Sequence, residues 1–167
     1  MFAEVIVDVS AYPIDRPFDY SVPIDIQPLI ESGCRVKVPF GNRSVLGFVT
    51  QIKFETEVPK EKQKPIHELL DIEPVFSEEM IMLSKWMKRE TMCYEIDALQ
   101  VMLPAALRAK YEKIIRYVNE DIPLPNELLA LFQGNETAEV TANTSKEMLA
   151  MIKKYIKNNA LVLETEV

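Results

Sequence analysis

Few residues of this chain are of a type and spacing that could do chemistry. In the run Arg-Pro-Phe-Asp-Tyr, from Arg16 to Tyr20, two aromatic side chains flank a carboxylate. If the run is a strand, Phe18 and Tyr20 face one side and Asp19 faces the other, because side chains alternate along a strand. Such a set could bind a ligand by stacking and by accepting a hydrogen bond. Taken alone, the residues favour the ordinary interpretation, which is two core aromatics beside a solvated carboxylate.

Two further residues could contribute to a binding site. Gly41 follows Pro-Phe in a sequence typical of a turn, and Lys64 ends a charged stretch. A glycine lets a ligand approach the backbone closely, and a lysine can neutralise a phosphate. The residues alone favour the ordinary interpretations, which are a turn glycine and a surface lysine.

No catalytic motif is present in the sequence. A phosphate-binding loop needs G-x-x-x-x-G-K-[ST], and the 4 glycines form no such run. The single histidine, His67, and the lack of a G-x-S-x-G run leave no nucleophile with an evident base. The carboxylates are numerous but scattered, so a two-metal nuclease is not indicated. We therefore expect that this chain is not itself an enzyme.

The composition indicates a globular chain with an acidic balance. Of its 167 residues 48% are hydrophobic and 27% are charged. No apolar run approaches the roughly 20 residues of a membrane-spanning helix, and the apolar start is interrupted by acids, so a secretory signal is not expected. We expect a cytoplasmic protein. A net charge of −7 argues against binding along any stretch of DNA but allows a small local site.

Cysteine usage argues against a metal site. Cys34, Cys93 and His67 are too few for structural zinc, which needs about four ligands. In a reducing compartment the two thiols are expected to be small buried hydrophobes rather than a disulfide.

The first 108 residues are predicted to be one domain of short strands followed by two helices. Strands are expected over residues 2–9, 18–22, 35–38, 45–54 and 65–70. Gly47 lies inside the longest of them and indicates a bulge or a close backbone approach. Ser77 can cap a helix over 78–91, and a second helix is expected over 94–101. This order fits a small, partly open OB-like β-barrel with flanking helices.

One apolar face is predicted on the first of these helices. It is formed by Met80, Leu83, Trp86 and Met87, which recur at helical spacing.

Residues 109–167 are predicted to be a second domain, because the composition changes near Leu107. A strand, two helices and a final strand are expected over 114–118, 127–132, 146–158 and 160–167. Met148, Ile152 and Tyr155 share one face of the longer helix, and this stripe is interpreted as core. The layout is that of a winged-helix-like α/β module that is cut off at its wing.

Several short motifs of the first domain occur in the order and spacing of a known family. They are Arg-Pro-Phe-Asp-Tyr at 16–20, Gly-Cys-Arg-Val-Lys-Val-Pro-Phe-Gly at 33–41, Leu-Gly-Phe-Val at 46–49, Leu-Leu-Asp-Ile-Glu-Pro-Val-Phe at 69–76 and Leu-Pro-Ala-Ala-Leu at 103–107. Together they resemble the N-terminal region of the PriA family of primosomal replication-restart helicases. The resemblance covers about residues 2–107 and rests on layout alone from residue 110 onward.

The resemblance implies a DNA-binding function. In the family the first domain holds the 3′-OH terminal nucleotide of nascent DNA at a stalled fork without base specificity, and a winged-helix domain follows. Two helicase lobes with a zinc-binding insertion then make the complete protein an ATP-dependent 3′-to-5′ DNA helicase. This chain looks like an N-terminal fragment without those lobes. No cofactor is expected in it, because zinc and Mg-ATP would belong to the missing part.

The resemblance also implies partners and a place in the cell. The partners are fork DNA with a 3′-OH end at a single-strand/duplex junction, primosome proteins and single-stranded-DNA-binding protein, without a membrane. The implied location is the cytoplasm, in association with the nucleoid.

Carried onto this chain, the family's terminal-nucleotide pocket falls on Phe18, Asp19, Gly41 and Lys64. Lys60 and Lys62 are rivals of Lys64, because the loop before it varies in length. A carboxylate near DNA is normally repelled by phosphate, but it can accept a charge-assisted hydrogen bond from a 3′-hydroxyl. Phe18 would supply a stacking surface that tolerates any base. Such a pocket selects an end rather than a sequence, and so needs few positive charges.

A basic cluster lies at the junction of the two domains. Its members are Arg108, Lys110, Lys113 and Arg116. They are either an exposed linker or a contact of the winged helix with the DNA backbone.

Two other functions stay open. The acidic balance favours a protein-interaction module that recruits primosome or single-stranded-DNA-binding protein partners and has little DNA affinity of its own. A general single-strand binder would need an aromatic-lined basic groove, and the chain offers few residues for one. The placement of Asp19 and Lys64 distinguishes the terminal-nucleotide pocket from these alternatives, because the pocket requires both residues on one concave surface beside Phe18.

Overall fold

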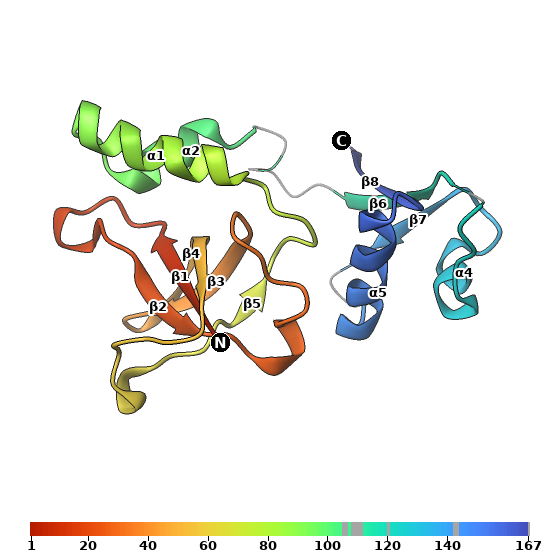
Figure 1. Ribbon diagram of the computed structural model, residues 1–167, viewed down its shortest axis with the longest axis horizontal. Coiled ribbons are helices and arrows are strands. Elements are labelled where there is room, and N and C mark those ends of the chain that lie inside the picture. Colours follow the sequence, from red (N-terminus) through yellow and green to blue (C-terminus); the bar gives the residue numbers. More distant parts are fainter. Residues whose placement is uncertain (105–106, 108–111, 120, 142–143, 167) are drawn as a thin grey trace. The chain divides into compact units, whose positions relative to one another are not determined.

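The structure is a computed structural model that describes residues 1–104, 107, 112–119, 121–141 and 144–166, with 112, 113 and 164–166 described by their backbone alone. These residues form two compact units, Met1–Leu103 and Pro104–Val167 (Figure 1). The expected domain boundary between 108 and 109 lies outside the described residues. Each unit contains its own antiparallel sheet together with helices, so the chain is of mixed α and β class.

The first unit is built on a five-stranded sheet in the order β2-β1-β4-β3-β5. Its strands are β1 (Phe2–Val7), β2 (Phe18–Ser21), β3 (Arg35–Phe40), β4 (Arg43–Lys53) and β5 (Glu68–Leu69). The five predicted strands are therefore confirmed, the fifth as a two-residue strand. Within residues 1–103, all of which are described, the sheet is not a closed barrel. One parallel bridge between Ser21 and Pro65 joins β2 to the chain that leads into β5.

The pairing of β1 with β4 contains a bulge that bears on the site. Glu4 pairs with Gln51 and Val5 pairs with Val49, so Thr50 is the extra residue. Gly47, where the sequence predicts a bulge or a close approach, shows the close approach. A Cβ atom there would lie 2.4 Å from the Val5 Cγ1 atom.

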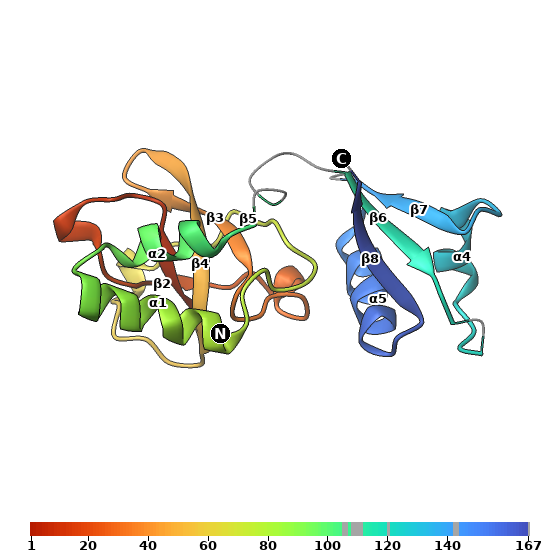
Figure 2. The ribbon, with the colours of Figure 1, turned by 90° about the horizontal axis from the view of Figure 1, so that it is seen from above.

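Two helices pack together beside this sheet (Figure 2). α1 (Glu78–Thr91) begins at Ser77, whose hydroxyl accepts a hydrogen bond from the Met80 N–H at 3.4 Å, so the predicted cap is confirmed. α2 (Glu95–Met102) contacts both α1 and β1. The face that α1 buries carries Ile81 and Ser84.

The apolar face predicted on α1 is buried only in part. Met80 and Met87 are half-buried, whereas Leu83 and Trp86 are 44% and 50% exposed. The reason is the composition of α1, which has apolar residues around most of its circumference, so that spacing alone does not identify the side that meets the sheet.

The second unit is a three-stranded sheet with two helices on one face (Figures 1 and 2). Its elements are β6 (Glu112–Tyr117), α4 (Asn126–Phe132), β7 (Thr137–Val140), α5 (Lys146–Lys157) and β8 (Leu161–Glu166). The sheet order is β7-β6-β8, with both neighbours antiparallel to β6. Ile152 of α5 is fully buried, as the core interpretation of its stripe predicts. β7 lies in a polar stretch for which the sequence predicts no strand.

In the part of the chain that the structure describes, no helix combines the length and the apolar character that crossing a membrane requires.

Candidate nucleic-acid interface

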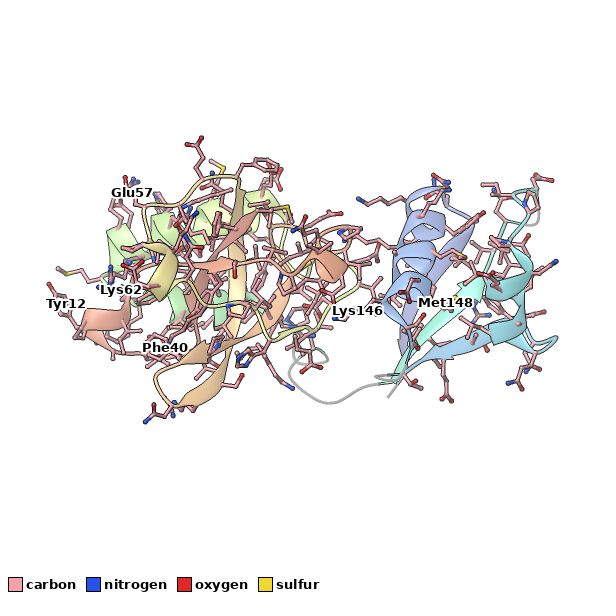
Figure 3. The ribbon with its side chains drawn as sticks, turned by 90° about the horizontal axis from the view of Figure 1, so that it is seen from below. Tyr12, Phe40, Glu57, Lys62, Lys146 and Met148 are labelled. Carbon is pink, nitrogen blue, oxygen red and sulfur yellow. The ribbon has the colours of Figure 1, made fainter. Side chains whose placement is uncertain are left out.

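A cleft of about 650 Å³ opens in the first unit beside β2. Its walls come from β1, β2, the end of β3, the end of β4 and the loop after β4. The residues that line it are Glu4, Arg16, Pro17, Phe18, Asp19, Tyr20, Pro39, Phe40, Gly41, Lys53, Glu57, Val58, Pro59, Lys62 and Lys64. Phe40, Glu57 and Lys62 are labelled in Figure 3.

All four residues predicted for a terminal-nucleotide pocket line this cleft. Phe18 and Asp19 come from β2, Gly41 from the turn between β3 and β4, and Lys64 from the chain before β5. Asp19 and Lys64 therefore lie on one concave surface beside Phe18.

β2 gives its aromatic residues and its carboxylate different surroundings. Tyr20 is part of the core cluster of the sheet, and Phe18 packs against that cluster. Burial raises the pKa of Tyr20 to about 12, so its hydroxyl stays protonated and donates to the Pro39 carbonyl oxygen at 3.2 Å. The Phe18 ring meets Phe40 edge to face, with ring centroids 5.5 Å apart. The predicted alternation along this strand is confirmed by these contacts.

Phe18 is covered on one side by a cation. The guanidinium carbon of Arg16 lies 4.8 Å from the centre of the Phe18 ring. This cation–π contact places a planar, permanently charged group beside an aromatic ring in the lining of the cleft.

The Asp19 carboxylate is held by two hydrogen bonds. Its Oδ1 accepts from the Lys53 ammonium at 3.1 Å, and its Oδ2 accepts from the Thr56 hydroxyl at 2.6 Å. The side chain is 15% exposed. Because each carboxylate oxygen has two lone pairs, each oxygen of Asp19 retains the capacity to accept one further hydrogen bond. The carboxylate is thus fixed in place and can still accept a donor that enters the cleft.

Lys53 links Asp19 to a second carboxylate. Its ammonium lies 2.6 Å from Glu4 Oε2, and the other oxygen of Glu4 accepts from the Thr50 hydroxyl at 2.9 Å. The hydrogen bond with Glu4 and, after it, the one with Asp19 raise the pKa of Lys53, while burial acts in the opposite direction. Lys53 therefore stays charged.

Sequence reasoning missed Glu4 and Lys53. Glu4 is the direct cross-strand partner of Asp19, and Phe2 is that of Lys53. An acid in the first strand and a lysine at the end of the longest one were the available signals. They become meaningful only when the register is known, because a shift of one residue would turn them to the opposite face.

Main-chain hydrogen bonds place Lys64. The Ser21 N–H donates to the Lys64 carbonyl at 2.9 Å, and the Ile66 N–H donates to the Ser21 carbonyl at 3.0 Å. Lys62 also lines the cleft, from the short 3-10 helix Lys60–Lys62, whereas Lys60 does not. Of the three rival lysines, two are thus placed at the cleft.

Gly41 occupies the tight turn that the sequence predicts. Phe40 pairs with Arg43 across a two-residue loop, and Gly41 has a φ of +59°. Glycine in the first position of such a loop is typical of the hairpin turns that match strand twist. No atom lies within 4 Å of the place that a Cβ of residue 41 would occupy.

The basic cluster at the junction is described only in part. Arg108 and Lys110 lie outside the described residues, as does the side chain of Lys113. Arg116 is half-buried on β6 of the second unit. Contact of this cluster with a DNA backbone stays a prediction.

Cys34 is buried, Cys93 is half-buried, and the two do not form a disulfide with each other. Across the described parts of both units, no group of three or more His, Cys, Asp and Glu side chains is arranged to hold a metal ion.

Comparison with known proteins identifies the family. Residues 4–104 match the family model described as the 3′DNA-binding domain (3′BD) of PriA. The replication restart protein PriA of Bacillus subtilis (strain 168) is 42% identical over 156 residues, which are 93% of this chain and 19% of that protein. Its namesake from Haemophilus influenzae is 39% identical over 67 residues, which are 40% of this chain and 9% of the relative. That from Buchnera aphidicola is 28% identical over 99 residues, which are 59% of this chain and 13% of the relative.

The chain thus spans no more than about a fifth of the length of these relatives, 19% in the longest alignment. The resemblance inferred from the short motifs is confirmed. Because the family model covers more than half of the chain, the chain belongs to the PriA 3′DNA-binding-domain family.

Proposed function

We propose that the cleft beside β2 binds the 3′-hydroxyl terminal nucleotide of a nascent DNA strand at a stalled fork, whatever its base. Membership of the 3′DNA-binding-domain family implies DNA 3′-end binding. The observation that carries the finer proposal is the convergence of Phe18, Asp19, Gly41 and Lys64 on one cleft.

Each part of the cleft has a chemical role in this proposal. Asp19 accepts a charge-assisted hydrogen bond from the 3′-hydroxyl. Phe18, with Arg16 over its ring, offers a surface on which any base can stack. Lys62 and Lys64 lie where they can neutralise the phosphate that precedes the terminal nucleotide. The carboxylate repels a phosphate at the strand end, so the end must carry a hydroxyl.

The experiment compares two fork-like DNAs that differ only in the recessed end, 3′-OH or 3′-phosphate, by fluorescence anisotropy at one moderate salt concentration. The protein is expected to prefer the 3′-OH fork. Asp19→Asn is expected to weaken binding to that fork by about tenfold, the cost of one charge-assisted hydrogen bond. Asp121→Asn is the matched control, because Asp121 is exposed in the second unit.

Three results decide this proposal. The proposal is supported if the original protein prefers the 3′-OH fork, if Asp19→Asn removes this preference and if Asp121→Asn keeps it. Equal binding of the two forks by the original protein reduces the claim to general DNA contact. Loss of folding in Asp19→Asn, seen as a lost thermal transition, would make Asp19 a structural residue.

The place of the chain in a larger protein is part of the proposal. We propose that the complete protein is an ATP-dependent 3′-to-5′ helicase that helps load the primosome and meets single-stranded-DNA-binding protein, in the cytoplasm at the nucleoid. Its Mg-ATP and zinc would be bound outside this chain. The first unit would be an OB-like, partly open barrel. The order of strands and helices in the second unit supports a winged-helix-like module.

One observation favours protein interaction as a second function. Met82, Leu83 and Trp86 of α1 are 69%, 44% and 50% exposed. Exposed apolar side chains grouped on one helix are typical of a contact with another protein. Absence of binding to either fork would favour this second function.

A further inference from the structure

Two carboxylates oppose each other directly in the sheet. Glu4 of β1 and Asp19 of β2 are cross-strand partners, and their side chains are 13% and 15% exposed. Like charges in directly opposite positions destabilise an antiparallel pair, and partial burial strengthens their repulsion. This arrangement therefore needs a compensating cation.

Lys53 supplies that cation from a third strand. Its ammonium is 2.6 Å from Glu4 Oε2 and 3.1 Å from Asp19 Oδ1. Lys53 is the last residue of β4, and the extra residue Thr50 in the same strand donates to Glu4. The remaining oxygen of Asp19 accepts from Thr56. Every oxygen of the two carboxylates thus has a partner, and the three charged groups together carry one net negative charge.

We propose that Glu4 and Lys53 are positioning and specificity-determining residues of the end-binding cleft. Lys53 holds the Asp19 carboxylate in place, and Glu4 holds Lys53 and leaves the site with a net negative charge that rejects a 3′-phosphate. This inference rests on the proposed function of the cleft. It adds that end selectivity is set by two residues that need not touch the terminal hydroxyl.

The charges elsewhere in the cleft fit this division of roles. Within the described first unit, Arg16, Lys62 and Lys64 line the cleft and form no hydrogen bond or ion pair with Glu4 or Asp19, and Glu57 lines it from the same stretch between β4 and β5 as Lys62. These cations can contact phosphates of the DNA strand that precede its 3′ end. Lys53 cannot do so as readily, because two carboxylates already occupy its ammonium. Lys53 should then contribute to end recognition but not to the salt dependence of binding, which counts phosphate contacts.

Glu4→Gln tests the charge of the site. The variant keeps the shape of residue 4 and an acceptor for Thr50, but it makes the group of three neutral. Binding to the 3′-phosphate fork is expected to tighten by about three- to thirtyfold, the effect of one charge at this range in a partly solvated site. Binding to the 3′-OH fork should change little, so the preference for the 3′-OH fork over the 3′-phosphate fork becomes smaller.

Lys53→Met tests the positioning of Asp19. Binding to the 3′-OH fork is expected to weaken by about tenfold or more, because two unpaired carboxylates repel each other. Lys53→Arg should retain the affinity for the 3′-OH fork, because the guanidinium group of arginine can bridge both carboxylates. The double variant Glu4→Gln with Lys53→Met restores one net negative charge and should recover most of the loss. Lys60→Met is the control, because it removes the same charge from an exposed position outside the cleft.

The slope of log affinity against log salt concentration separates positioning from phosphate contact. A lysine that contacts a phosphate lowers the slope by about 1 when it is removed. Lys53→Met is expected to keep the original slope while losing end affinity. A slope reduced by that amount, or a loss no larger than that of Lys60→Met, overturns the inference.

The outcomes also separate this inference from the proposed function. If the original protein prefers the 3′-OH fork and Asp19→Asn removes the preference, the cleft is an end-binding site. Unchanged selectivity in Glu4→Gln and Lys53→Met would then overturn only the roles of these two residues. If Lys53→Met fails to fold, Glu4→Gln still tests the inference. An unaltered affinity of Glu4→Gln for the 3′-phosphate fork would contradict the claim that the net negative charge of the site rejects a 3′-phosphate.

Discussion

Gly41→Ala separates the cost of folding from the cost of binding at one position. Gly41 is in the left-handed region, with a φ of +59°, and no atom lies within 4 Å of the place that its Cβ would take. In the protein without DNA an added methyl group therefore meets nothing. If a sugar or base approaches this backbone closely, the same methyl group obstructs the ligand.

The folding cost follows from the backbone alone. A left-handed conformation costs an L-residue about 1–2 kcal/mol. For a unit of this size each kcal/mol lowers the melting temperature by about 4–8 °C, so a decrease of roughly 5–15 °C is expected. The binding cost is separate. A methyl group forced into a packed contact costs about 1–3 kcal/mol, which weakens binding by roughly five- to 150-fold.

The assay is the anisotropy titration of the 3′-OH fork at a temperature well below the melting transition of the variant. Gly134→Ala is the matched control. Gly134 also has a positive φ, +86°, with no atom within 4 Å of its Cβ position, but it lies in the second unit. A folded Gly41→Ala protein that binds the fork as tightly as the original would refute the idea of close approach and leave Gly41 a turn residue. An equal loss in Gly134→Ala would show that the effect is not local to the cleft.

Two further predictions concern stability. Burial raises the pKa of Glu95, and Lys88 acts in the opposite direction. The folded state therefore holds the proton of Glu95 more tightly than the unfolded chain does. As a result, the protein loses stability as pH rises above the ordinary glutamate pKa of 4.5. Glu95→Gln should flatten this loss and raise the free energy of unfolding near neutral pH by on the order of 1 kcal/mol in urea titrations; an unchanged pH slope would contradict this. Asp71→Ala should lower the free energy of unfolding by about 3–5 kcal/mol, because Asp71 is 4% exposed and pairs with Arg35 at 2.8 Å; a loss below about 1 kcal/mol would mean that the pair behaves as an exposed one.

The elements that sequence reasoning predicted are those with a local cause. Ser77 determines where α1 starts because its hydroxyl bonds to the backbone of the first turn. β4 is recognisable from a stretch rich in Val, Ile, Thr and Phe, and Gly41 marks the turn before it. The polar stretch that contains β7 gave no such signal, because β7 becomes a strand only by pairing with β6.

The sequence motifs named residues that line one cleft, but they did not name the partners that hold them. Phe18 and Asp19 lie in a motif and line the cleft together with Lys64, and their role in binding stays a proposal. The partner of Asp19 was not predictable, because Lys53 is 34 residues away in sequence and reaches it through a bulged strand. Only the register shift at Thr50 decides which side chains of β4 lie beside Glu4.

The acidic balance of the chain and DNA binding are compatible for a structural reason. The net charge is −7, yet the cleft is lined by four cationic side chains and three carboxylates. One of those cations, Lys53, is bound by two of the carboxylates. The other three, Arg16, Lys62 and Lys64, line the same cleft and form no ion pair with Glu4 or Asp19 in the described first unit. Cations that can meet a phosphate and carboxylates that can repel a terminal phosphate are thus both present in one cleft, which makes the proposed end selectivity compatible with an acidic chain. A more basic surface would bind DNA anywhere along a strand, and the proposed selection of the strand end would not be expected of it.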